Sequence, residues 1–78
     1  MKPHVKTYLD YFEYGIDDWI PCENCLNRAV DIHHLTFRPQ GGTNDINNLV
    51  AVCRECYNKA HNDAGFNEYL RIIHQKNL

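Results

Sequence analysis

At 78 residues the chain is long enough for one domain with a thin core, which commonly needs a disulfide, a metal or a partner chain for stability. Its 44% hydrophobic content argues against disorder, and no apolar run approaches the roughly 18 residues of a membrane span. The net charge of −2 argues against binding to nucleic acid through charge alone, and the charged, aromatic N-terminus does not resemble a signal peptide, so we expect a cytoplasmic protein with reduced cysteines.

The first predicted element is an amphipathic helix over about residues 4–14. Pro3 suits its first turn and Gly15 its end. Apolar residues recur at the i, i+3, i+4, i+7 spacing of one helix face, at Val5, Tyr8, Leu9 and Phe12. His4 in this helix is expected on the surface, as is His74 near the other end of the chain.

Two strands and two further helices are predicted after this helix. Apolar patterning indicates strands over residues 28–35 and 48–53. A short helix is expected over 54–62, with Gly65 ending it, and a last amphipathic helix over about 66–76. The loop between the strands is punctuated by turn-forming residues, Pro39, Gly41 and Gly42.

Four cysteines form two CxxC pairs, separated by 27 residues, at Cys22, Cys25, Cys53 and Cys56. In a reducing compartment this pattern predicts a tetrathiolate zinc site, because each CxxC turn aims two sulfurs at one point. A closed shell of four sulfurs leaves no position for substrate, so this zinc is expected to be structural. Two disulfides or a redox pair are the alternative, which the expected compartment disfavours.

The segment "CENC…DIHHLTFRPQGGTNDINNLVAVCRECYNKAH" resembles the zinc-containing HNH endonucleases over Cys22 to His61. The resemblance rests on the doubled histidine, the Gly-Gly turn, the Asn-Leu pair opening the second strand and the CxxC that starts the helix. It implies an α+β, ββα-metal, treble-clef-like fold: one HNH domain over residues 1–78 with its core at about 22–62. The helices at the two ends lie outside the resemblance.

The family's pattern implies a role for each polar residue of this segment. His34 would be the general base that activates water, and His33 and His61 would ligate one catalytic divalent ion: Mg²⁺, Mn²⁺, Ni²⁺ or Zn²⁺. Neighbouring side chains of a regular strand diverge, so this pattern requires the strand to end or kink at the histidine pair. Asn48 would be the scaffold asparagine that pins the loop, with Asn44 and Asn47 as competitors.

These roles together imply metal-dependent hydrolysis of DNA phosphodiester bonds. Arg38, Arg54 and Lys59 are the candidate phosphate contacts. Similar small stand-alone HNH chains occur in bacteriophages and bacterial mobile elements, where a protein partner often supplies targeting. No membrane association is expected.

Tyr57 departs from the family's pattern, which usually has histidine or asparagine one helical turn before His61. A phenol that keeps its proton is a poor ligand for a hard divalent ion. His33 and His61 could hold the metal with waters and substrate phosphate, or Asn58 could reach in. Alternatively the site is degenerate, and the chain is a DNA- or protein-binding module. Asp31 could orient His61 or ligate directly.

Overall fold

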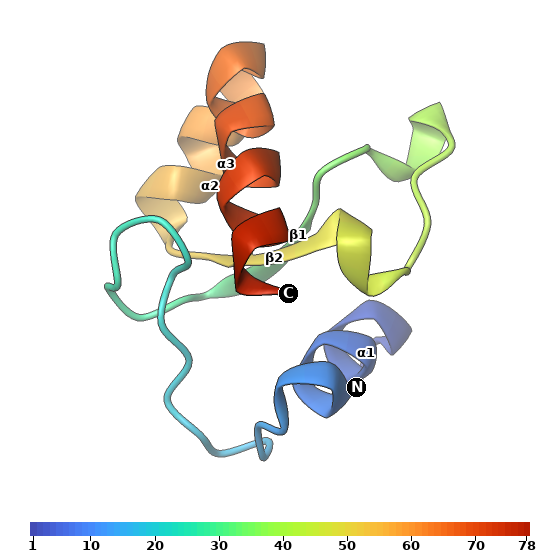
Figure 1. The fold of residues 1–78 in the computed structure, drawn as a ribbon, viewed down its shortest axis with the longest axis vertical. Helices are drawn as coiled ribbons and strands as arrows, with labels where there is room; N and C mark the ends of the chain where they lie inside the picture. The colour runs from blue at the N-terminus through green and yellow to red at the C-terminus, as the bar shows by residue number, and fades with distance from the viewer.

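The computed structural model describes all of residues 1–78 and confirms a small α+β fold with three α-helices and one two-stranded sheet (Figure 1). In chain order the helices and strands are α1 (Pro3–Phe12), β1 (Asp31–His34), β2 (Leu49–Val52), α2 (Arg54–Asn62) and α3 (Ala64–Asn77). Two single 3₁₀ turns, η1 (Arg38–Gln40) and η2 (Ile46–Asn48), lie in the connection between the strands. None of the helices is both long and apolar enough to cross a membrane.

The first helix ends at Phe12, before Gly15, because Glu13 caps it in the left-handed conformation with φ of +60°. Two other boundaries also differ from the predicted ones for local reasons. The first strand begins at Asp31 and not at residue 28, because Arg28 pairs instead with Pro21 in an isolated bridge beside the first CxxC turn. The break between α2 and α3 falls at Asp63 and not at Gly65. The Asp63 carboxylate accepts a hydrogen bond from Phe66 N at 3.1 Å and so caps α3, which places Gly65 in the first turn of that helix.

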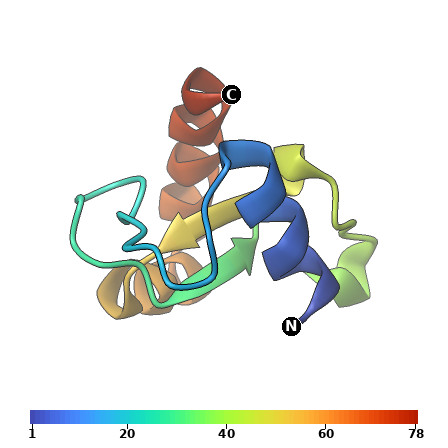
Figure 2. The same ribbon diagram turned by 90° about the horizontal axis from the view of Figure 1, so that it is seen from below.

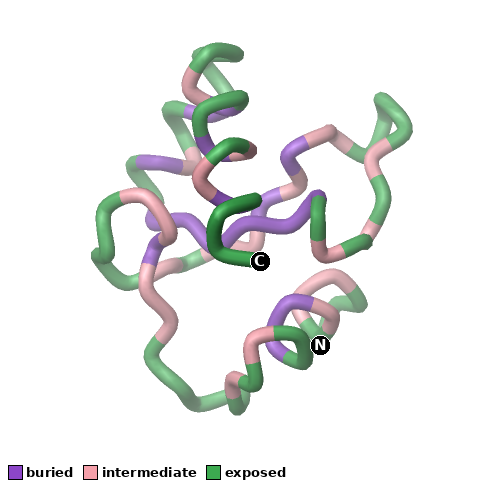
Figure 3. Tube along the Cα trace, viewed as in Figure 1, coloured by how far each residue is buried: buried purple, intermediate pink, exposed green.

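The hairpin of β1 and β2 lies between α1 on one side and α2 with α3 on the other (Figure 2). The strands are antiparallel, with His33 opposite Val50 and His34 opposite Leu49. All four residues of β2 are buried, as its colour in Figure 3 shows. Val50 packs in the cluster that contains three of the four cysteines and Leu70 of α3, whereas Leu49 packs against Tyr8 of α1. Alternate residues of this strand therefore serve two small cores.

His74 of α3 is fully buried, so the expectation that it lies on the surface is wrong. Its Nδ1 lies 2.9 and 3.0 Å from the two carboxylate oxygens of Glu23, and its Nε2 lies 2.7 Å from the carbonyl oxygen of Ile46. Because both ring nitrogens face acceptors, both carry protons. His74 is therefore an imidazolium paired with a buried carboxylate.

The Glu23 carboxylate accepts three further hydrogen bonds, from Tyr8 Oη at 2.7 Å, Asn77 Nδ2 at 2.9 Å and Ala51 N at 3.3 Å. Burial disfavours the ionised carboxylate, but the hydrogen bonds from His74, Asn77 and Tyr8 outweigh it and lower the pKa of Glu23. Burial likewise disfavours the imidazolium, but Glu23 and the Ile46 carbonyl raise the pKa of His74 overall. The pair joins the first CxxC turn to α3.

Replacing His74 by leucine should destabilise the fold by about 3 to 5 kcal/mol, because the buried Glu23 carboxylate would lose its partner. The imidazolium stabilises the folded state fully below the pKa that histidine has in the unfolded chain. This contribution is lost as the pH rises through the higher pKa of folded His74. In urea titrations the difference between wild type and His74→Leu should therefore be larger at about pH 6 than at about pH 9.

Gln75→Leu is the matched control, since Gln75 is the exposed neighbour on the same helix. It should leave the unfolding midpoint nearly unchanged. Both variants keep all four cysteines, so thiol ionisation cancels in the comparison. A difference between wild type and His74→Leu that stays constant or grows with pH would contradict the imidazolium assignment.

Candidate active site and zinc site

The four cysteines converge at the start of α2, and none forms a disulfide. Their sulfurs all lie within 4.8 Å of one another, with Cys25 Sγ and Cys53 Sγ at 3.6 Å. Four sulfurs at 2.3 Å from a tetrahedral zinc ion would be separated by roughly 3.8 Å. Cys53 also caps α2, its sulfur accepting a hydrogen bond from Cys56 N at 3.5 Å. The cluster could therefore bind a zinc ion.

Cys22 and Cys56 differ in how readily they ionise. Burial opposes the Cys22 thiolate, but hydrogen bonds with the backbone of Cys25 and Cys53 outweigh it and lower its pKa to about 7. Burial raises the pKa of Cys56 to about 12, although the Asn24 amide donates to its sulfur at 3.4 Å. Neighbouring thiolates repel one another, and a divalent ion at their centre would remove that repulsion.

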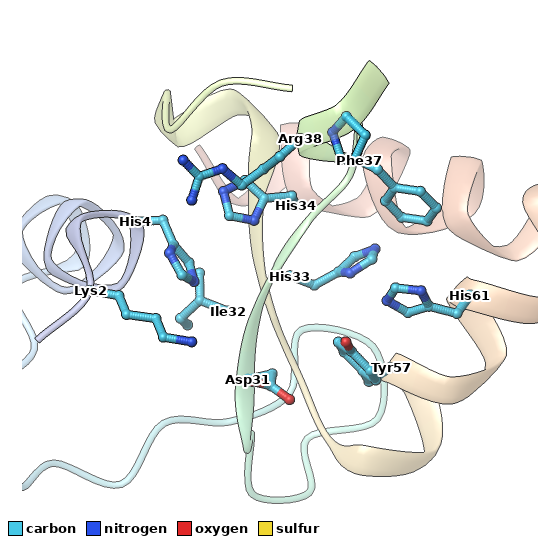
Figure 4. A pocket seen from close by; sticks show the side chains of 11 residues that line it. Lys2, His4, Asp31, Ile32, His33, His34, Phe37, Arg38, Tyr57 and His61 are labelled. Atoms are coloured by element: carbon cyan, nitrogen blue, oxygen red, sulfur yellow. The ribbon is translucent and has the colours of Figure 1, made fainter. Parts of the chain in front are cut away.

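A cavity of about 330 Å³ lies beside the end of β1, away from the cysteines (Figure 4). Four of the predicted site residues line it: His33, His34, Arg38 and His61. Tyr57 and Asp31 line it as well. Residues from the hairpin, from the loop after β1 and from α2 thus meet at one place.

His33 of β1 and His61 of α2 point toward each other across this cavity, with ring centroids 5.3 Å apart (Figure 4). His61 stacks on Phe37 with centroids 4.9 Å apart, and Tyr57 lies on its other side at 4.3 Å. Burial lowers the pKa of His33, which keeps its imidazole neutral and able to bind a metal. The two rings could hold one ion between them.

Tyr57 occupies the place where the family's pattern has a third ligand, one turn before His61. Its ring lies 5.8 Å from that of His33 and lines the cavity. Asn58, the alternative ligand, is exposed and does not line the cavity. Asp31 accepts a hydrogen bond from Arg54 Nη2 at 3.1 Å, so it pairs with this arginine and not with His61.

His34 lies on the other side of the strand from His33 (Figure 4). β1 ends at His34, as the pattern required, yet the two rings still diverge. His34 Nε2 lies 2.8 Å from Asn44 Oδ1. The oxygen accepts, so Nε2 carries the proton and Nδ1 is the basic nitrogen of the neutral ring.

Asn48 is the asparagine whose amide joins the two ends of the long connection between the strands. Its Oδ1 accepts from Thr36 N at 2.7 Å, and its Nδ2 donates to the carbonyl oxygens of Thr36 at 3.1 Å and Thr43 at 2.8 Å. Of the competitors, Asn44 contacts His34 and Asn47 is exposed.

The Gly-Gly pair lets the connection close onto Thr36. Gly41 has φ of +89°, a left-handed conformation that ends η1. A Cβ at Gly42 would lie 1.8 Å from the carbonyl oxygen of Thr36, so no larger residue fits without moving the backbone. Both glycines therefore support the position of His34, which is next but one to Thr36.

The three candidate phosphate contacts lie in different surroundings. Arg38 is exposed and lines the cavity. Arg54 is paired with Asp31 and lies over the Tyr57 ring at 4.9 Å. Lys59 lies over the Phe66 ring at 4.6 Å and does not line the cavity. The geometry thus favours Arg38 over Arg54 and Lys59 as the residue that contacts phosphate.

Sequence reasoning missed Lys2 and His4, which α1 brings to the same cavity (Figure 4). His4, which was expected on the surface, is half-buried: its ring centroid is 4.5 Å from that of His34, and its Nδ1 is buried without a hydrogen-bond partner. Phe37 was missed as well. Lys2 and His4 lie about 30 residues before the histidine pair, and no spacing in the sequence signals that proximity.

Changing Asn48 to aspartate should destabilise the fold by about 2 kcal/mol or more, because a carboxylate oxygen would face two carbonyl oxygens in a buried place. Urea unfolding measures the loss, and hydrogen exchange of the Thr36 amide reports on the connection directly. Asn47→Asp adds the same charge at the exposed neighbour and should change little. Equal effects of the two substitutions would show that the Asn48 amide does not hold the loop.

Comparison with known proteins agrees with this geometry. The family model described as HNH endonuclease matches residues 22–63, which is more than half of the chain. The type IV methyl-directed restriction enzyme EcoKMcrA of Escherichia coli strain K12 is 26% identical over 82 residues, an alignment that covers 92% of this chain. The chain spans only 28% of the length of that enzyme. No solved structure matches the chain. The chain belongs to the HNH endonuclease family.

Proposed function

We propose that this chain is a metal-dependent endonuclease that hydrolyses DNA phosphodiester bonds. The observation that supports this function best is the cavity at the end of β1. It has a pair of facing imidazoles, His33 and His61, on one side of the strand and a further imidazole, His34, on the other. A phosphate bound at the strand end would lie between the two groups.

His33 and His61 would hold the divalent ion. Both are imidazoles on regular elements, and burial keeps His33 neutral. When bound, the ion would neutralise charge on the scissile phosphate and on the leaving 3′ oxygen. Imidazole ligands suit Ni²⁺ and Zn²⁺, whereas Mg²⁺ and Mn²⁺ would take most of their ligands from water and phosphate oxygens.

His34 would be the general base. With Nε2 donating to Asn44, the lone pair on Nδ1 takes a proton from water, and that water attacks phosphorus in line with the 3′ oxygen. The bond between phosphorus and the 3′ oxygen breaks, and that oxygen takes a proton from solvent, so the products are a 5′-phosphate and a 3′-hydroxyl. Asn48 and the glycines position His34 without touching the substrate, since they hold the start of the loop at Thr36.

The cysteine cluster would bind a structural zinc that takes no part in cleavage. Its four sulfurs leave no open coordination position, and the cluster is at the opposite end of α2 from His61. Methyl-directed recognition is a property in the name of the longer E. coli relative, and the 28% that aligns gives no reason to extend it to this chain.

Tyr57 supports one alternative, a catalytically degenerate domain that binds DNA or a protein. Its phenol fills the usual position of a third ligand, so the cavity offers the ion two imidazoles. We favour the enzyme because His33, His34 and His61 all still line the cavity.

Conversion of supercoiled plasmid to nicked and linear forms at low salt tests this function. Zinc-loaded protein should cut when Mg²⁺, Mn²⁺ or Ni²⁺ is added, and His34→Ala should slow cutting at least about 100-fold, the contribution of a general base. Zinc content and far-UV circular dichroism check that the variant is folded. Equal cutting by the variant, or no cutting by the wild type with any ion, would favour the binding module.

Changing Arg38 to alanine should weaken DNA binding and nicking, because its guanidinium lines the cavity where the phosphate would sit. Arg28→Ala is the matched control, since Arg28 is exposed and does not line the cavity. Fluorescence anisotropy with a short duplex, repeated over several salt concentrations, should show a smaller salt slope for Arg38→Ala only. The same loss in both variants would mean that the cavity does not direct DNA binding.

A further inference from the structure

Asn67 of α3 is a buried polar residue that contacts the candidate metal site from behind. Its Oδ1 lies 2.8 Å from His33 Nε2, and its Nδ2 donates to the carbonyl oxygen of Leu35 at 2.8 Å. Its side chain is 9% exposed, and His33 is 3% exposed. Asn67 lies outside residues 22–63, so the family match does not assign it a role.

The contact with Leu35 determines which way the Asn67 amide is turned. A carbonyl oxygen can only accept, so the NH₂ group must face Leu35 and the amide oxygen must face His33. That oxygen in turn requires a proton on Nε2 of His33. In a neutral imidazole with a proton on Nε2, Nδ1 has the only available lone pair.

We propose that Asn67 is a positioning residue for the metal site, fixing His33 in the Nε2-protonated tautomer so that Nδ1 is the atom offered to the divalent ion. This inference rests on the function proposed above, because it assigns His33 to a metal. Residues that accept a hydrogen bond from the far N–H of a metal-bound imidazole orient the ring and strengthen the ligand.

A second contact shows that α3 also holds the residues that follow His34. Arg71, one turn after Asn67, donates from Nη2 to Thr36 Oγ1 at 3.1 Å. α3 therefore contacts His33, Leu35 and Thr36, the residues on both sides of His34. The C-terminal helix is thus part of the candidate active site.

The first measurement is the tautomer of His33 in the zinc-loaded wild type without any second metal, by long-range ¹H–¹⁵N NMR of the imidazoles. We expect a protonated Nε2, a bare Nδ1, and an Nε2 proton that exchanges slowly with water. A proton on Nδ1 would overturn the proposal. This readout needs no second metal and no DNA, so it is independent of whether the protein cuts.

The second measurement is the affinity for Mn²⁺ or Ni²⁺ by titration calorimetry of the zinc-loaded full chain. Asn67→Leu removes the acceptor and should weaken binding about 10- to 100-fold while speeding exchange of the Nε2 proton. Asn67→Asp keeps an acceptor oxygen toward His33, so the folded variant should retain most of the metal affinity. Its second oxygen would face the Leu35 carbonyl oxygen, so this variant should also be less stable than the wild type, as argued for Asn48→Asp. A structural role alone would instead make both variants equally weak.

Asn62→Ala is the control, because Asn62 is exposed and its amide contacts only the backbone of Asn58. It should bind metal like the wild type. Unchanged metal affinity in Asn67→Leu would overturn the proposal. If that variant does not fold, the tautomer of His33 in the wild type and the metal affinity of Asn67→Asp still test the proposal. A wild type that binds no second metal would refute the proposed nuclease, whereas the slow Nε2 proton would still establish the contact with Asn67.

Discussion

The ion pair between Glu23 and His74 connects segments that are far apart in the sequence. Glu23 follows the first cysteine directly, and its carboxylate receives hydrogen bonds from α1, from β2 and from two residues of α3. A chain of this length buries few apolar residues, and its two clusters contain eight and three buried residues. The ion pair lies where these small cores meet, so the position of the first CxxC turn, and with it any zinc site, depends on it.

α3 links this structural centre to the candidate active site. Asn67 and His74 are seven residues apart, which places them on the same face of the helix two turns from each other. Asn67 contacts the histidine of the cavity, and His74 contacts the carboxylate beside the cysteines. Leu70 lies between them and is fully buried. One helix face thus sets the geometry of both sites, and a shift of α3 along its axis would disturb both together.

The sequence predicted those elements that have local signals. The CxxC turns, the Gly-Gly pair and the apolar run of residues 49–52 place the hairpin and α2 within a few residues. Asn48 was distinguished from its neighbours by standing directly before Leu49, and its amide does join Thr36 to Thr43. These signals suffice because the partners are close in the chain or belong to one motif.

Residues whose partners are distant were not predicted. His74 pairs with a residue 51 positions away and Asn67 with one 34 positions away, and the ring of His4 in α1 lies beside that of His34. A polar residue at a buried helix position looks like a surface residue in the sequence, because hydrophobic periodicity records apolar residues only. The apolar stripe of the last helix was visible, but the polar residues interleaved with it were not.

Tyr57 limits the number of side chains with which the protein could bind an ion in the candidate site. It and Phe37 lie on either side of the exposed His61 ring, so both contacts limit the orientations of this imidazole. With two imidazoles as ligands, more of an ion's coordination shell is left to water and to substrate phosphate than in a site with three. Such a site depends more on the orientation of each ligand, because a third ligand is not there to compensate for a misdirected ring. In the proposed site, the aromatic contacts of His61 and the Asn67 contact of His33 would serve the same end, which is to orient two metal ligands where three are usual.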